Sequence, residues 1–135
     1  MLRTLIAFAL LLPLAAACSG PAAPQTDGVC YRAQFPASGP PQFQPLANGV
    51  GNLESCAVLL EAMRLKGEPE VDGAYQGYFI FADDRQISSA LHTGGLRYPV
   101  FQPPQRATVD ADLLRLMKAR GGNLPDAGSL SLERH

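Results

Sequence analysis

Three cysteines and two histidines carry the most specific chemistry that this sequence of 135 residues offers. The cysteines stand at positions 18, 30 and 56, and the histidines at positions 92 and 135. Their spacing matches no C-x-x-C or H-E-x-x-H pattern, and the sequence contains no G-x-S-x-G or phosphate-binding loop. Two cysteines without a neighbouring third ligand cannot complete a tetrahedral zinc shell. The sequence therefore predicts no catalytic residue, no metal site and no cofactor.

Cys18 follows a segment that has the layout of a secretory signal peptide. A positive side chain stands near the start, the apolar run LIAFALLL follows, and Ala15-Ala16-Ala17 offers an A-x-A cleavage site. Pro13 interrupts the apolar stretch, which is also shorter than the roughly 20 residues that a membrane-spanning helix needs. We therefore expect residues 1–17 to be a signal peptide that is removed on export.

Ala16, Ala17 and Cys18 resemble the end of the lipobox of bacterial lipoproteins, in which leucine, a small residue and glycine or alanine precede the lipidated cysteine. Ala15 departs from this pattern, because leucine is usual there and lies one place earlier in this chain. The resemblance implies that Cys18 becomes a palmitoylated N-terminus, and that Ser19 in place of aspartate permits sorting to the outer membrane, on its periplasmic side. Ordinary cleavage, which would release a soluble periplasmic or secreted protein, stays open as the alternative.

Lipidation of Cys18 would leave Cys30 and Cys56 as an even pair in an oxidising compartment. A disulfide between them would close a loop of roughly 27 residues and contribute about 3–4 kcal/mol in the chain-entropy model. The alternative is two buried free thiols. We expect the disulfide.

Asp83, Asp84 and His92 are the side chains that a small-ligand or hydrolytic site would have to use. The two aspartates lack the further oxygen ligands of a calcium loop and fit a polar turn, and His92 begins a second predicted turn. A small-ligand binder or minor hydrolase with a pocket near His92 remains the alternative function. It requires these three side chains to converge in one concave site.

Tyr78, Arg97 and Tyr98 are the candidate partner surface, because tyrosine and arginine are favoured anchors at interfaces. Phe79 and Phe81 are expected to pack in the core between sheet and helices. Without the leader the charge is 10 minus 12, or −2 with histidine neutral, since 11 basic and 12 acidic residues include one basic residue in the leader. This balance disfavours nucleic acid as a partner.

Hydrophobic periodicity predicts the elements that position these residues. A strand is expected over 29–35, an irregular connection over 36–51, and a helix that Asn52 caps and Gly67 ends. A turn at 71–73 precedes a central strand over 74–82, and two further strands follow over 86–91 and 96–101. A second helix is expected to begin at an Asp110 cap and to end at Gly121.

These elements predict an α+β fold: a small antiparallel meander with two helices packed on one face, in the order β-α-β-β-β-α. Residues 29–121 form the domain, residues 18–28 a disordered tether and residues 122–135 a flexible tail. The expected function is that of an exported, lipid-anchored cell-envelope protein, a non-enzymatic binding or assembly module. Its expected partners are the membrane, through the lipid on Cys18, and an envelope protein or the cell wall.

Overall fold

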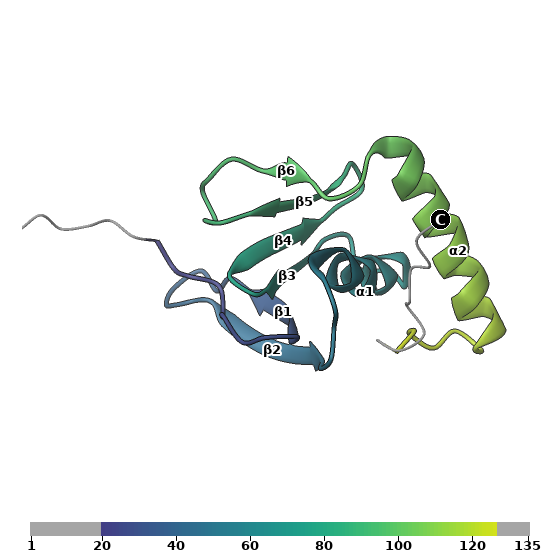
Figure 1. Ribbon diagram of the computed structural model, residues 1–135, viewed down its shortest axis with the longest axis horizontal. Coiled ribbons are helices and arrows are strands. Elements are labelled where there is room, and N and C mark those ends of the chain that lie inside the picture. The colour runs from purple at the N-terminus through teal and green to yellow at the C-terminus, as the bar shows by residue number, and fades with distance from the viewer. Residues whose placement is uncertain (1–19, 127–135) are drawn as a thin grey trace, which may run out of the picture.

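The computed structural model describes residues 20–126, so the predicted signal peptide, Cys18 and the end of the predicted tail lie outside the described residues. Six strands form one antiparallel sheet in the order β2-β1-β3-β4-β5-β6, with two helices beside it (Figure 1). The α+β class is confirmed. In chain order the elements are β1 (Cys30–Gln34), β2 (Gln42–Ala47), α1 (Leu53–Leu65), β3 (Val71–Tyr75), β4 (Tyr78–Ala82), β5 (Ile87–Ala90), β6 (Tyr98–Pro99) and α2 (Pro103–Ala119).

Two strands were not expected, and they change the order to β-β-α-β-β-β-β-α. The first is β2, which lies in the segment predicted to be irregular and pairs with β1. It contains Pro45, which a sheet tolerates there because β2 is an edge strand. The proline and glycine content of residues 36–51 therefore suggested an irregular connection where the structure has an edge strand.

The second unexpected strand comes from the stretch predicted as one long strand, which is a hairpin. Gln76 and Gly77 both adopt positive φ, 42° and 87°, as in two-residue hairpin turns, and join β3 to β4. The predicted turn at 71–73 is wrong, because these residues begin β3. Apolar residues on both sides of Gln76-Gly77 suggested one strand, although a polar residue followed by glycine is itself a hairpin-turn signal.

The first helix begins where its cap was predicted, and the second does not. Asn52 Oδ1 accepts a hydrogen bond from the Ser55 backbone N–H at 2.8 Å, which satisfies a free donor at the start of α1. Helix α2 begins at Pro103, seven residues before Asp110. Proline is favoured in the first turn of a helix, where its missing N–H has no intrahelical partner to lose. Asp110 is therefore an interior residue of α2 and not its cap.

Helix α1 lies against β1, β3 and β4, whereas α2 packs mainly against α1. Gly73 in β3 allows α1 to come close, because a Cβ at this position would lie 2.4 Å from Leu60 Cδ1 and 2.6 Å from the Tyr31 carbonyl oxygen. Helix α2 adds Leu113 and Met117 to the core that α1 shares with the sheet. No helix within residues 20–126 has the length and apolar character needed to cross a bilayer.

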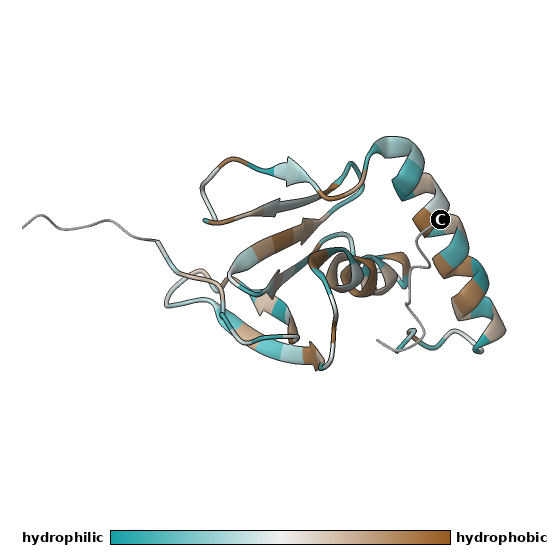
Figure 2. Cartoon of the chain, in the orientation of Figure 1, coloured by the Kyte–Doolittle hydropathy of each residue, from teal (hydrophilic) through white to brown (hydrophobic). Residues whose placement is uncertain are grey.

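Strand β4 is apolar on both faces, as a central strand requires (Figure 2). Ile80 and Ala82 belong to the core under the helices. Phe79 and Phe81 are buried too, but they point to the opposite face and join a separate cluster. The expectation that these two rings pack between sheet and helices is wrong, because alternate side chains of a strand face opposite ways.

The second face of the sheet is covered by aromatic rings and by the N-terminal segment. Phe35 lies 5.9 Å from Phe79, ring centre to ring centre, and Phe43 lies 6.1 Å from it. Ala23 is 4 % exposed in the same cluster, and Pro24 accepts a hydrogen bond from the Gly77 N–H at 2.8 Å. Residues 20–28 therefore do not form the disordered tether that their composition suggested, because the small Ala23 fits the sheet and the Pro24 carbonyl binds a hairpin turn.

Candidate functional site

A disulfide joins Cys30 of β1 to Cys56 of α1, as predicted. Cys30 faces α1 because the alternation of β1 places Tyr31 and Ala33 on the other side of the sheet. The two Cα atoms are 5.3 Å apart, and neither cysteine is exposed to solvent. The bond ties a central strand to the helix that covers it, and such bonds persist in oxidising compartments.

Tyr78 and Tyr98, two of the three predicted partner-surface residues, line one hollow of about 510 Å³. Leu91 and Leu96 line it as well, and we call the surface formed by these four residues the tyrosine hollow. Their exposed fractions are 43 % for Tyr78, 56 % for Leu91, 77 % for Leu96 and 63 % for Tyr98. Residues from the start of β4, the β5–β6 connection and β6 thus form a largely apolar exposed surface.

Arg97, the third predicted residue, does not share this hollow. Its guanidinium carbon lies 3.8 Å from the centre of the Phe81 ring, an arrangement that gives a cation–π attraction. Arg97 lines a separate hollow of about 460 Å³ with Phe35, Phe81 and three carboxylates, and we call this the acidic hollow. Alternation along the chain explains the separation, since Arg97 and Tyr98 are neighbours that point to different sides.

The carboxylates of the acidic hollow are Glu70, Asp72 and Asp83. Burial, with added repulsion from Glu70 and Asp83, raises the pKa of Asp72, although Arg97 opposes the change. These groups do not converge into a metal site. Among residues 20–126, no group of three or more histidine, cysteine, aspartate or glutamate side chains is placed to hold a metal ion.

Asp83, Asp84 and His92 are not brought together in one site. Asp83 and Asp84 follow β4 at its turn into β5, whereas His92 follows the far end of β5. Asp83 Oδ1 accepts backbone hydrogen bonds from Arg85 at 2.7 Å and Gln86 at 2.9 Å, which is turn chemistry. His92 lines the tyrosine hollow and Asp83 the acidic hollow, so the geometry required by the alternative function is not met.

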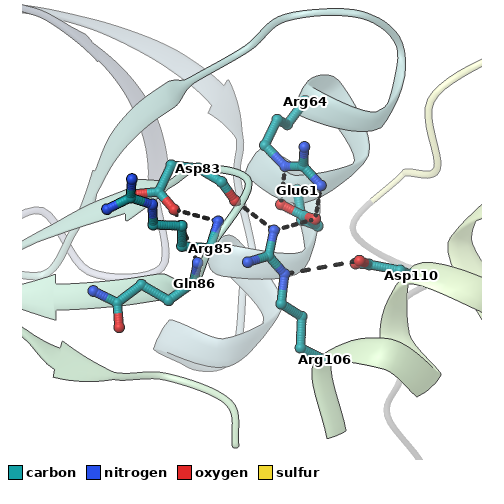
Figure 3. Close-up of polar contacts among 7 residues, drawn as sticks. All are labelled: Glu61, Arg64, Asp83, Arg85, Gln86, Arg106 and Asp110. Carbon is teal, nitrogen blue, oxygen red and sulfur yellow. Dashed lines mark hydrogen bonds and ion pairs between the residues drawn. The ribbon is translucent and has the colours of Figure 1, made fainter. Parts of the chain in front are cut away.

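A cluster of charged side chains joins α1, α2 and the β4–β5 turn (Figure 3). At its centre is Glu61, whose side chain is fully buried. Glu61 Oε1 accepts hydrogen bonds from Arg64 Nη2 at 2.7 Å and from Arg106 Nη2 at 3.1 Å. Arg106 also donates to the Asp83 carbonyl oxygen, and its Nε lies 3.7 Å from Asp110 Oδ2.

The pKa values of the two carboxyl groups in this cluster, Glu61 and Asp110, are shifted in opposite directions. Burial acts to raise the pKa of Glu61, but hydrogen bonding with Arg64, Asp110 and Arg106 outweighs it and holds the pKa below its ordinary value. Burial and the nearby Glu61 carboxylate raise the pKa of Asp110 to about 6. Arg106 thus links α2 both to a buried carboxylate and to the sheet.

In the sequence pattern Glu61 falls with Glu54 and Arg64 largely on the polar side of this helix, so the pattern does not anticipate a buried cluster. A usable signal exists in the sequence: Glu61 lies four residues after buried Ala57, and Arg106 lies four residues before Asp110 on what proved to be one helix. The spacing of Arg106 and Asp110 is informative only if both lie on one helix, and a helix that begins at Asp110 excludes Arg106.

No family model matches the chain, and no curated protein or solved structure matches it either.

Proposed function

We propose that this protein is an exported cell-envelope protein, anchored by lipid on Cys18, that acts as a non-enzymatic binding module. The leader and lipobox resemblance support the anchor, and the Cys30–Cys56 disulfide is consistent with a compartment outside the cytoplasm. The module binds its partner through the tyrosine hollow rather than through a polar cleft.

One observation carries the binding role: four exposed large apolar side chains gather at a single hollow. Seven large hydrophobic residues are exposed within the part of the chain that the structure describes, and four of these are Tyr78, Leu91, Leu96 and Tyr98. Scattered apolar residues are ordinary on a protein surface, but a contiguous exposed group marks an interaction site. Tyrosine adds a hydroxyl at the edge of such a surface, which suits a boundary between apolar and polar surroundings.

The anchor is tested by metabolic labelling with a palmitate analogue in cells that express the chain. Wild type should incorporate the label, and Cys18→Ser should lose it while the protein is still exported. Equal labelling of both proteins would remove the anchor and leave a soluble periplasmic or secreted protein.

The binding role is tested by crosslinking in intact envelopes followed by recovery of the protein. The double variant Tyr78→Ala/Tyr98→Ala should lose the crosslinks, to lipid or to protein, that wild type forms through this surface. Leu114→Ala is the matched control, because Leu114 is 51 % exposed on α2 and does not line the tyrosine hollow. Identical crosslinked material from wild type and the double variant would contradict the assignment of this surface.

A further inference from the structure

The leading segment, residues 20–28, packs on the sheet and so limits how far the domain can move from an anchor at Cys18. Ala23 is buried against the sheet, so the chain is fixed only five residues after Cys18. Five extended residues span at most about 18 Å, which is less than the thickness of a small domain. A lipid on Cys18 would therefore hold this end of the domain at the membrane surface.

The tyrosine hollow lies at the same end of the sheet. Pro24 binds the Gly77 N–H in the β3–β4 turn, and Tyr78 of the tyrosine hollow is the next residue along the chain. Ala23 packs with Phe79 and Ala90 on the face of the sheet opposite Tyr78, so the leading segment and the tyrosine hollow share an end of the sheet and not a face. In Figure 1 the N-terminal segment and the β5–β6 connection both lie at the left of the sheet, away from α2.

We propose that the tyrosine hollow docks on the lipid bilayer that holds Cys18, and that the bilayer is the partner of this surface. The proposal rests on the lipid anchor of the proposed function. Leu91 and Leu96 enter the boundary between headgroups and acyl chains, to a depth of about 5–10 Å. Tyr78 and Tyr98 lie at headgroup level, where aromatic side chains with a polar end are favoured.

Two carboxylates of the acidic hollow lie away from the anchored end, although Asp27 lies beside Gly28, whose N–H donates to Gln76 in the β3–β4 turn. In the β3–β4 hairpin Tyr75 pairs with Tyr78 near the turn, and Val71 pairs with Ala82 at the other end. Asp72 and Asp83 lie at that other end, so these carboxylates of the acidic hollow are set back along the hairpin from the turn beside the anchor. Anionic headgroups would repel those carboxylates if the domain lay the other way round.

The test uses the fact that the chain contains no tryptophan, so a single introduced tryptophan reports on one position. Leu96→Trp places the reporter at the most exposed residue of the tyrosine hollow, and Leu114→Trp places the control on α2. Each purified protein is anchored in vesicles of phosphatidylethanolamine and phosphatidylglycerol that carry bromine near the headgroup end of the acyl chains. Leu96→Trp should show blue-shifted emission and strong quenching, while Leu114→Trp should keep the emission of a tryptophan in water.

Anchoring in this experiment need not depend on lipidation in cells. The chain has three cysteines, and Cys30 and Cys56 are joined, so a maleimide lipid can be coupled to the remaining thiol of Cys18. Failure of the labelling experiment would thus overturn the natural anchor without affecting this measurement. Equal quenching of the two reporters, or none in either, would overturn bilayer docking. If the quenching test failed and the crosslinks that depend on Tyr78 and Tyr98 joined the chain to a protein, that protein and not the bilayer would be the partner.

Discussion

Replacing Arg106 by methionine should lower the free energy of unfolding by about 3 kcal/mol. The guanidinium, whose side chain is 10 % exposed, binds the buried Glu61 carboxylate and the Asp83 carbonyl oxygen. Breaking a buried ion pair from one side costs about 3–5 kcal/mol, because the other charge remains buried without its partner. Arg64 still pairs with Glu61 in the variant, which places the expected loss at the low end of that range.

The assay is urea denaturation of the purified protein at neutral pH, followed by far-UV circular dichroism. Arg115→Met is the matched control, since Arg115 lies on the same helix, is 80 % exposed and pairs only at the surface with Asp112. Exposed pairs contribute about 0–1 kcal/mol, so the control should cost less than 1 kcal/mol.

A double-mutant cycle with Glu61→Gln separates the ion pair from the general packing of α2. If the two charges interact as the structure shows, the cost of Arg106→Met should fall by about 1–3 kcal/mol in the Glu61→Gln background. Equal costs of Arg106→Met and Arg115→Met, or strict additivity in the cycle, would refute the reasoning.

Three further changes test other parts of the fold. Reduction of the Cys30–Cys56 disulfide should lower the free energy of unfolding by about 3.5 kcal/mol; an unchanged urea midpoint with reductant would contradict this. The pKa of Asp110 rises from its ordinary value near 3.8 to about 6 on folding, so the stability this group contributes is complete below pH 3.8 and is lost as pH rises through about 6. Asp110→Asn should flatten the stability profile across that window, and a profile identical to wild type would argue against the raised pKa. Gly73→Ala should cost about 1–3 kcal/mol because its methyl group would collide with α1, whereas Gly51→Ala, which has open space, should be nearly neutral; similar midpoints for the two would disprove the close contact.

Local signals in the sequence were sufficient to predict features in which one residue type has one physical role. Asn52 predicted its own cap because its side chain binds a backbone donor within the same turn. The even pair of cysteines left after Cys18, in an oxidising compartment, predicted the bond between Cys30 and Cys56. These inferences needed no knowledge of distant parts of the chain.

Features that depend on tertiary contact were missed. Residues 74–82 suggested one strand because they are mostly apolar, and the weight of Gln76-Gly77 as a turn became clear only from the pairing of β3 with β4 and the positive φ of both residues. Glu61 read as a surface residue, since its burial depends on Arg106 from a helix 45 residues later. The tyrosine hollow was predicted in part: Tyr78 and Tyr98 meet there, but their positions relative to Leu91 and Leu96 follow from the path of the β5–β6 connection.

The position of β1 has a mechanical consequence for any protein held by its N-terminal end. A pull on residue 20 reaches β1 within ten residues, and β1 is hydrogen-bonded on both sides, to β2 and to β3. The first residue of β1 is Cys30, so the same pull meets the disulfide to α1 as soon as the leading segment has peeled away. Force applied at this end would then be shared by two hydrogen-bonded strands and a covalent bond, and residues 31–55 could not extend until the disulfide is reduced.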